Sequence, residues 1–134
     1  MNLLIDIDVP DLRQGIDFYC AAFDLRLNRL LDEDVAELVG GSSVIYLLEK
    51  EAQTPCAGTS TDRRRYARHW TPLHLDFVVQ DLEQATARVI AAGATRESDC
   101  IHWRGSRCIS FADPFGHGFC LIAFEGDSYG DEAV

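Results

Sequence analysis

The sequence has few positive charges and no long apolar segment. Its 134 residues include 12 lysines and arginines against 22 aspartates and glutamates, for a formal net charge of -10. This charge argues against binding the phosphates of a nucleic acid, which requires a positive surface, and against binding an anionic membrane. No apolar stretch is long enough to span a bilayer, and no basic segment precedes an apolar run near the N-terminus. We therefore expect a cytoplasmic protein.

Several motifs that would identify a reaction class are absent as well. The chain contains no G-x-S-x-G, no P-loop and no G-x-G-x-x-G, so the chemistry tied to these motifs is not indicated. It has no C-x-x-C spacing, and its odd number of cysteines indicates reduced thiols. The cysteines are Cys20, Cys56, Cys100, Cys108 and Cys120. Most of them are expected to act as small buried apolar side chains.

The sequence does contain an internal repeat. Residues 4–14 (LIDIDVPDLRQ) are echoed in register by residues 74–84 (HLDFVVQDLEQ). In each copy an alternating strand pattern runs into a helix start, with an aspartate as the expected N-cap residue. A duplicated unit usually builds a paired structure whose ligand site lies where the copies meet. Mismatches between the copies, above all Leu4 against His74, are therefore the evidence about function.

Both halves follow the same predicted order of one strand, one helix and three strands, which makes the fold class α+β. In the first half, the patterns predict a helix over 12–23 and strands near 4–9, 26–31, 35–39 and 44–48. In the second half, they predict a helix over 82–92 and strands near 74–79, 95–101, 107–112 and 118–124. We expect two βαβββ modules, at about residues 2–50 and 72–125, joined by a linker at 51–71.

The second half carries the most specific motifs. They are residues 74–82, the stretch AAGA at 91–94, Trp103, Arg107 and the stretch FADPFGHGFCL at 111–121. In this order they resemble the glyoxalase/bleomycin-resistance/extradiol-dioxygenase superfamily, also called vicinal oxygen chelate, and its glyoxalase-like subgroup in particular. The resemblance implies one domain over residues 1–134, in which the two modules form a cupped, mixed-sheet half-barrel around a ligand cavity. It also implies a homodimer.

The resemblance further implies four metal-ligand positions, which fall here on Leu4, Tyr46, His74 and Cys120. Only His74 is a usual ligand of the metal-dependent members. Leucine offers no electron pair, and tyrosine binds a metal only as a phenolate, with an ordinary pKa of about 10. A cysteine thiolate suits zinc, but two good ligands are too few for tight binding. We therefore expect a degenerate metal site and, as a cofactor, at most a weakly bound divalent metal.

Strand alternation places two carboxylates beside these positions, Asp6 on the face of Leu4 and Asp76 on the face of His74. His74 and Asp76 are the expected catalytic residues of any acid–base chemistry, since a histidine carries protons near neutrality and carboxylates shift one another's pKa. The alternative is a polar network that only links the strands. The expected substrate-binding residues are Asp6, Tyr46, Trp103, Arg107 and Cys120.

A basic cluster in the linker permits three interpretations. It comprises Arg63, Arg64, Arg65 and Arg68. The cluster could form a solvated loop, or it could hold an anionic ligand, because a guanidinium binds carboxylate or phosphate through two hydrogen bonds. With the neighbouring aromatic residues it could also form a dimer contact.

Three functions are consistent with the sequence. The leading hypothesis is a protein that binds a small molecule in the cavity between its modules, as the bleomycin-resistance members do, and that retains a degenerate metal site. The alternative is a metal-assisted lyase, isomerase or dioxygenase-type enzyme that acts on a small oxygenated substrate through His74 and Asp76. A third interpretation, a non-catalytic dimerisation or regulatory module, requires an occluded cavity.

Overall fold

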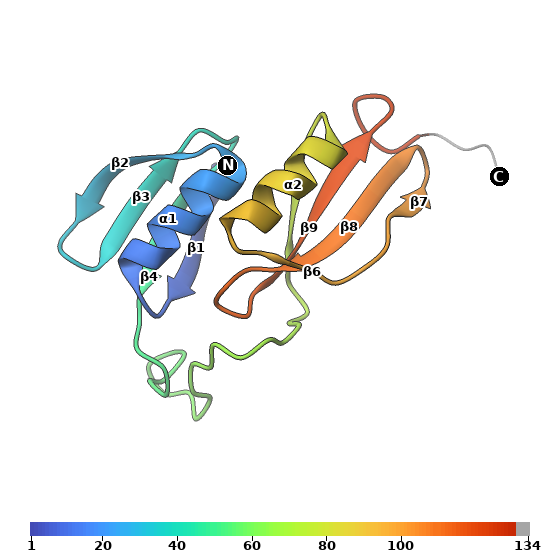
Figure 1. Cartoon of the computed structure of the whole chain (residues 1–134). Coiled ribbons are helices and arrows are strands. Elements are labelled where there is room, and N and C mark those ends of the chain that lie inside the picture. The colour runs from blue at the N-terminus through green and yellow to red at the C-terminus, as the bar shows by residue number, and fades with distance from the viewer. Residues whose placement is uncertain (131–134) are drawn as a thin grey trace. The chain divides into compact units, whose positions relative to one another are not determined.

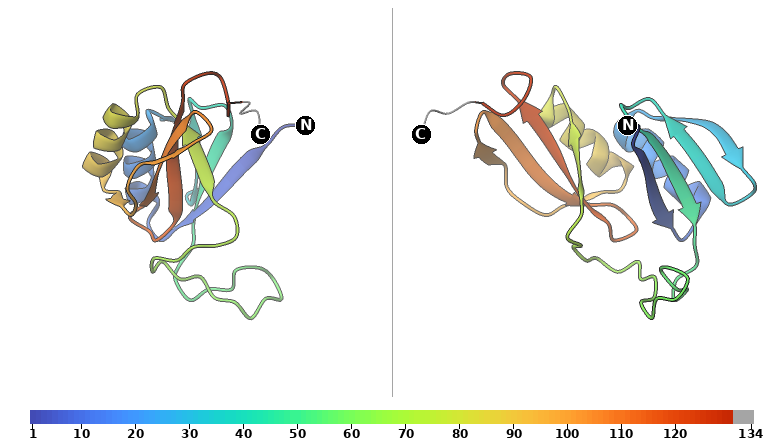
Figure 2. Two further views of the ribbon diagram at one scale, coloured as in Figure 1. Left: turned by 90° about the vertical axis from the view of Figure 1, so that its right-hand side faces the viewer. Right: turned by 180° about the vertical axis from the view of Figure 1, so that it is seen from behind.

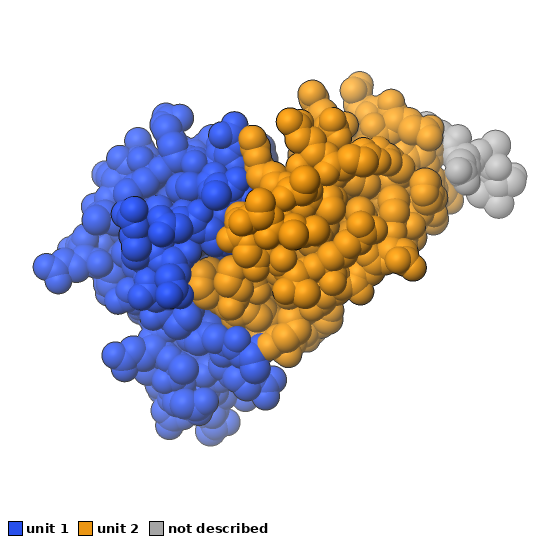
Figure 3. Space-filling model, viewed as in Figure 1, with its two compact units in different colours: residues 1–67 blue, residues 68–134 orange. Residues whose placement is uncertain are grey.

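The computed structural model describes residues 1–130. The chain divides into two compact units, residues 1–67 and residues 68–134 (Figure 3). Each unit contains one helix and one mixed sheet (Figure 1). Within the described residues, neither helix is long and apolar enough to cross a membrane. The boundary between the units falls inside the predicted linker, and the single domain over residues 1–134 stays a prediction.

The first unit has the predicted βαβββ order. Its elements are β1 (Leu4–Val9), α1 (Leu12–Phe23), β2 (Arg26–Leu31), β3 (Val35–Val39) and β4 (Val44–Glu49). The strands lie in the order β1-β4-β3-β2, with β1 parallel to β4 and the other pairs antiparallel. The side chain of Asp11 caps α1 by accepting a hydrogen bond from the Gln14 N–H at 2.9 Å. The predicted N-cap is confirmed.

A glycine allows α1 to pack closely on this sheet. A Cβ at Gly15 would lie 3.1 Å from a methyl carbon of Val9 and 3.2 Å from one of Leu47. Val9 and Leu47 are both fully buried, as are Ala36 and Leu38 on β3. The core of the first unit therefore lies between α1 and the strands β1, β3 and β4, and a larger residue in place of Gly15 would push the helix away.

The second unit contains one strand more than predicted. Its elements are β5 (Leu75–Val78), α2 (Leu82–Ala92), β6 (Thr95–Arg96), β7 (Ile101–Trp103), β8 (Ser106–Ala112) and β9 (Gly118–Phe124). The strands lie in the order β5-β9-β8-β6, and β7 also pairs with β8. The prediction of one strand near 95–101 was wrong. The Ser98 hydroxyl accepts a hydrogen bond from the Ser110 N–H at 2.9 Å, so a side chain replaces the backbone ladder between β6 and β7.

The two sheets share one pairing register, which extends the sequence repeat into three dimensions. In the first sheet Asp6 on β1 lies opposite Tyr46 on the parallel strand β4. In the second sheet Asp76 on β5 lies opposite Cys120 on the parallel strand β9. Positions that match in the repeat therefore occupy equivalent places in their own sheets.

The core of the second unit is aromatic. Phe111 on β8 stacks on Phe119 on β9 with ring centroids 5.4 Å apart, and Phe77 on β5 meets Phe119 edge-on at 5.8 Å. Phe111 and Leu121 are fully buried. Helix α2 covers one face of this sheet, as Figure 2 shows from two further directions. Val89 of α2 is also fully buried.

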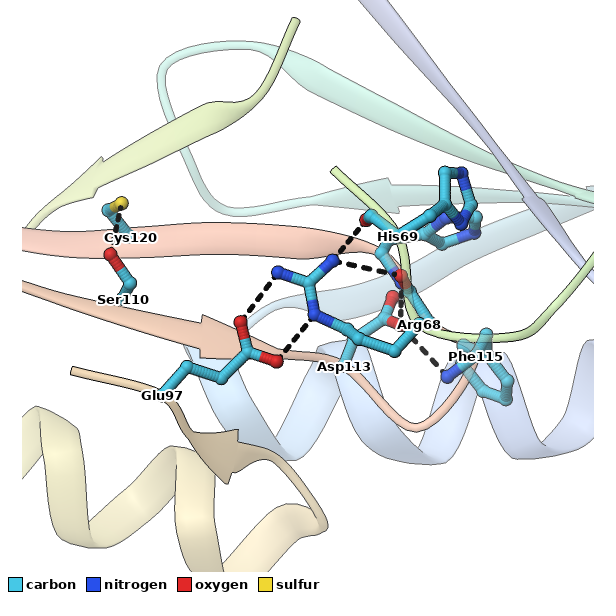
Figure 4. A network of polar contacts seen from close by, with 9 residues as sticks. Arg68, His69, Glu97, Ser110, Asp113, Phe115 and Cys120 are labelled. Atoms are coloured by element: carbon cyan, nitrogen blue, oxygen red, sulfur yellow. Dashed lines mark hydrogen bonds and ion pairs between the residues drawn. The ribbon is translucent and has the colours of Figure 1, made fainter. Parts of the chain in front are cut away.

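The turn between β8 and β9 depends on one buried carboxylate. Asp113 is 5% exposed and accepts hydrogen bonds from the N–H groups of Phe115 at 2.8 Å and His117 at 2.9 Å (Figure 4). Asp113→Ala would leave both N–H groups without this acceptor, so we expect a loss of about 3 kcal/mol of unfolding free energy, measured by urea denaturation. Asp127→Ala, at an exposed position, is the control and should change it little. Equal losses in both variants would contradict this role.

Candidate functional site

His74 and Asp76 form an open polar pair at the start of β5. The Nε2 atom of His74 lies 3.2 Å from Oδ1 of Asp76, and the two side chains are 43% and 38% exposed. Because side chains alternate along a strand, Phe77 points to the other face, where it packs on Phe119. The pair is therefore accessible to a ligand on the face of the sheet that α2 does not cover.

Cys120 lies beside this pair on the neighbouring strand. It is only 6% exposed, and its Sγ atom lies 3.4 Å from the Ser110 hydroxyl (Figure 4). The ligand atoms of His74, Asp76 and Cys120 all lie within 4.8 Å of one another. Burial is the main cause that raises the pKa of the Cys120 thiol, and the negative charge of Asp76 adds to it.

Cys108, which the sequence predicts to be a small buried apolar side chain, lies next to this cluster. Cys108 lies diagonally across from Cys120 on the adjacent antiparallel strand, on the same face of the sheet. Burial, followed by the adjacent Cys120 and the charge of Asp76, raises the pKa of the Cys108 thiol to about 12. Strand alternation could have found it, because Cys108 and Ser110 share one face of β8.

Trp70 bounds the site at the His74 side. Its ring meets the His74 ring edge-on at 5.5 Å, and the Arg68 guanidinium lies 4.4 Å from its centroid. Gly118 leaves room for this packing, since a Cβ there would lie 2.7 Å from a ring carbon of Trp70. Arg68 is held by a bidentate ion pair with Glu97 (Figure 4). The hydrogen bond from Arg68 lowers the pKa of the Glu97 carboxyl.

The arginines of the predicted linker are not one solvated run. The guanidinium of Arg64 binds the Asp8 carboxylate at 2.7 Å, and the Arg64 side chain is 16% exposed. Arg68 binds Glu97 in the second unit. Arg63 donates a longer hydrogen bond, 3.3 Å, to the carbonyl of Gln53. Arg64 and Arg68 are therefore neutralised by carboxylates of the chain itself.

In the first unit the equivalent place is filled by a closed network. The Tyr46 hydroxyl donates to Glu37 at 2.8 Å, and Glu37 also accepts hydrogen bonds from Asn28 and Arg29. Glu37 is 6% exposed, and the hydrogen bonds from Arg29, Asn28 and Tyr46 lower its pKa to about 2. The hydrogen bond that the Tyr46 hydroxyl donates to Glu37 is the main cause that raises the pKa of Tyr46. Asp6 is exposed beside Tyr46.

Glu37 could not be found from the sequence, because its partners come from two other strands, β2 and β4, and no local motif marks it. Tyr46 is fully engaged as a hydrogen-bond donor and is therefore a poor metal ligand. Leu4, at the remaining first-half position, is 59% exposed and carries no donor atom. Neither residue adds a ligand.

Two predicted substrate-binding residues lie apart from the His74–Asp76 pair. Arg107 forms an ion pair with Glu83 on α2 and so lies on the helix-covered face of the sheet. Trp103 on β7 is 58% exposed, and its ring meets that of Tyr129 at 5.1 Å. The structure thus brings together His74, Asp76 and Cys120 from the predicted set, and adds Cys108 and Trp70.

The donor set of this cluster fits a divalent metal. An imidazole, a carboxylate and a thiol are the three donor types that bind zinc in proteins, and three protein ligands leave a position open. All three donors come from the second unit, so the missing donors at Leu4 and Tyr46 do not prevent binding there.

Comparison with solved structures confirms the predicted fold. A glyoxalase/bleomycin resistance protein/dioxygenase from Nocardioides is similar with a TM-score of 0.68 and 17% identity, covering 100% of this chain and 89% of the other. Lactoylglutathione lyase from Agrobacterium tumefaciens has a TM-score of 0.63 and 19% identity, with 92% of each chain covered.

A variant of the fosfomycin resistance protein FosX from Listeria monocytogenes, complexed with Mn(II) and 1S,2S-dihydroxypropylphosphonic acid, is also similar. Its TM-score is 0.67 at 19% identity, covering 90% of this chain and 86% of the other. A search of curated protein sequences gives no match. The family model of the glyoxalase-like domain matches residues 4–122. The chain therefore belongs to the glyoxalase-like domain family.

Proposed function

We propose that this protein binds a small oxygenated molecule at the His74–Asp76 pair. The observation that carries the proposal is the open pair itself, with its atoms 3.2 Å apart and both side chains about two-fifths exposed. Small-molecule sites combine a few placed polar groups with apolar walls, and here Trp70 supplies the aromatic wall. The dihydroxypropylphosphonic acid bound by FosX is a ligand of this chemical class.

The roles of the residues follow from their contacts. When the proton of the His74 ring is on Nε2, which lies 3.2 Å from Oδ1 of Asp76, the Nδ1 atom is an acceptor for a hydroxyl group of the ligand. Asp76 holds the ring in this orientation. His74, Asp76 and Cys120 would hold a divalent metal, which when bound polarises a ligand oxygen.

A second candidate is the metal-assisted lyase, isomerase or dioxygenase-type enzyme. The observation that favours it is the convergence of three donor atoms within 4.8 Å on an accessible face. In that case His74 moves a proton at Nδ1 and Asp76 orients the ring. The homodimer implied by the family resemblance stays a prediction.

Calorimetric titration of the chelator-treated protein with 1,2-dihydroxypropylphosphonic acid tests the proposed binding. At about 100 times its dissociation constant the probe should stabilise the protein by about 2.7 kcal/mol. We expect His74→Gln and Asp76→Asn to lose this binding, because each removes one member of the polar pair. The matched controls are His102→Gln and Asp99→Asn, at exposed positions, which should bind as the unmodified chain does. Binding that survives both His74→Gln and Asp76→Asn would refute the proposal.

A further inference from the structure

The backbone of His74 lies just outside the strand ladder. Pairing of β5 with β9 begins one residue later, where Leu75 lies opposite Phe119. The preceding residues, 68–73, are here called the anchor segment. This segment meets β9 through an isolated bridge between His69 and His117. The position of the His74 ring therefore depends on the side chains that hold the anchor segment on the sheet.

The first of these contacts is the ion pair between Arg68 and Glu97. The Nε and Nη2 atoms of Arg68 lie 2.5 and 2.6 Å from the two carboxylate oxygens (Figure 4), and the side chains are 27% and 25% exposed. Arg68 also donates to the carbonyl of Gly116 at 3.4 Å. The Glu97 N–H donates to the carbonyl of Ser110 on β8 at 2.8 Å. The carboxylate is thus fixed to the sheet, and it fixes the guanidinium in turn.

Trp70 carries this constraint from Arg68 to His74. The Arg68 guanidinium lies 4.4 Å from the centroid of the Trp70 ring, and the ring meets His74 edge-on at 5.5 Å. The ring rests on Gly118, where a Cβ would lie 2.7 Å from a ring carbon. A continuous chain of contacts therefore runs from the carboxylate on the sheet to the histidine of the proposed ligand site.

We propose that Arg68 and Glu97 are positioning residues that hold Trp70 on Gly118 and thereby set the ligand affinity of His74. The inference rests on the proposed function because it concerns the same His74–Asp76 pair. An ion pair near the surface adds little to stability by itself. Its effect here is to order His74 before the ligand arrives, so that the ligand does not have to order it on binding.

Glu97→Gln tests this role because it removes the charge and keeps the size of the side chain. We expect calorimetric titration with 1,2-dihydroxypropylphosphonic acid to give an affinity about tenfold weaker, since the probe must now order the anchor segment. Removing a negative charge would by itself strengthen the binding of an anionic probe, so electrostatics alone predicts the opposite sign.

Glu83→Gln is the matched control. It breaks the ion pair between Glu83 and Arg107, which joins its atoms at 2.5 Å on the helix-covered face of the same sheet. This variant should bind the probe as the unmodified chain does. A general loss of stability in the second unit would instead affect both variants alike.

Two spectroscopic readouts follow the position of the rings directly. The ring current of Trp70 shifts the proton resonances of the His74 ring, and in Glu97→Gln these resonances should move toward the values of an unpacked histidine. In the Trp103→Phe background Trp70 is the single tryptophan of the chain, and Glu97→Gln should increase the quenching of its fluorescence by acrylamide.

Gly118→Ala displaces Trp70 without changing any charge. The added Cβ would lie 2.7 Å from the Trp70 ring, so we expect weaker probe binding and the same change in the His74 resonances. Gly126→Ala, where no heavy atom lies within 4 Å of the added Cβ, is the matched control and should change neither. Thermal denaturation of each variant establishes that it is folded.

Two results would overturn the inference. One is a Glu97→Gln variant that binds the probe as tightly as Glu83→Gln does, and the other is weaker binding with unchanged His74 resonances and Trp70 quenching. The first result leaves the proposed ligand site intact. If the unmodified chain does not bind the phosphonic acid, the proposed ligand is rejected, and the His74 resonances still decide whether Glu97 positions the ring.

Discussion

Glu37→Gln is expected to remove a large part of the acid sensitivity of the fold. Glu37 is buried and accepts hydrogen bonds from Arg29, Asn28 and Tyr46, which lower its pKa to about 2. A carboxyl with a lowered folded-state pKa contributes stability that is complete above its unfolded pKa of about 4.3. That contribution is lost as the pH falls through the folded value near 2. The variant lacks it at every pH.

Urea denaturation between neutral pH and about pH 2 measures this effect. The unmodified chain should be the more stable at neutral pH, and the difference from Glu37→Gln should shrink steadily below about pH 4.3. Glu33→Gln, at an exposed position in the turn after β2, is the matched control. Its unfolding free energy should depend on pH as that of the unmodified chain does. A difference that stays constant down to pH 2 would contradict the role given to Glu37.

Phe111→Ala is expected to cost about 4 kcal/mol of unfolding free energy. Phe111 is fully buried and stacks on Phe119 at 5.4 Å, so truncation removes apolar contact and leaves a cavity between β8 and β9. The strands on either side are fixed by their backbone ladder, which limits how far the cavity can collapse.

Guanidinium denaturation of Phe111→Ala measures this loss. The matched control is Val78→Ala on β5, where the side chain is 67% exposed and truncation should change stability by less than about 0.5 kcal/mol. A loss below about 1 kcal/mol in Phe111→Ala would mean that the aromatic pair is not central to the core of the second unit.

The sequence repeat predicted most of the fold because its signals are local. Alternation and N-cap aspartates depend on neighbouring residues, and they placed β1, α1, β5 and α2 to within about two residues. The division of the predicted strand near 95–101 depends on Ser98 meeting Ser110. That contact joins residues 12 apart in sequence, and no local pattern marks it.

The candidate site was only partly predictable for the same reason. His74 and Asp76 share a face by alternation on one strand, so their proximity could be inferred directly. Cys108 joins them only through the pairing of β8 with β9. Arg107 was chosen from the family resemblance, yet its neighbour Cys108 already lies on the site face. Alternation therefore places Arg107 on the opposite face, where it meets Glu83.

The common register of the two sheets has a consequence for how the halves diverged. Glu37 lies opposite Tyr46 in the first half, and Ser110 lies opposite Cys120 in the second. At this shared position the first half buries a carboxylate and pairs it internally, while the second pairs a hydroxyl with a thiol beside the exposed His74–Asp76 pair. The two halves have therefore taken on different roles. Substitutions around Tyr46 should mainly change the free energy of unfolding, and substitutions around Cys120 should mainly change ligand binding at the His74–Asp76 pair.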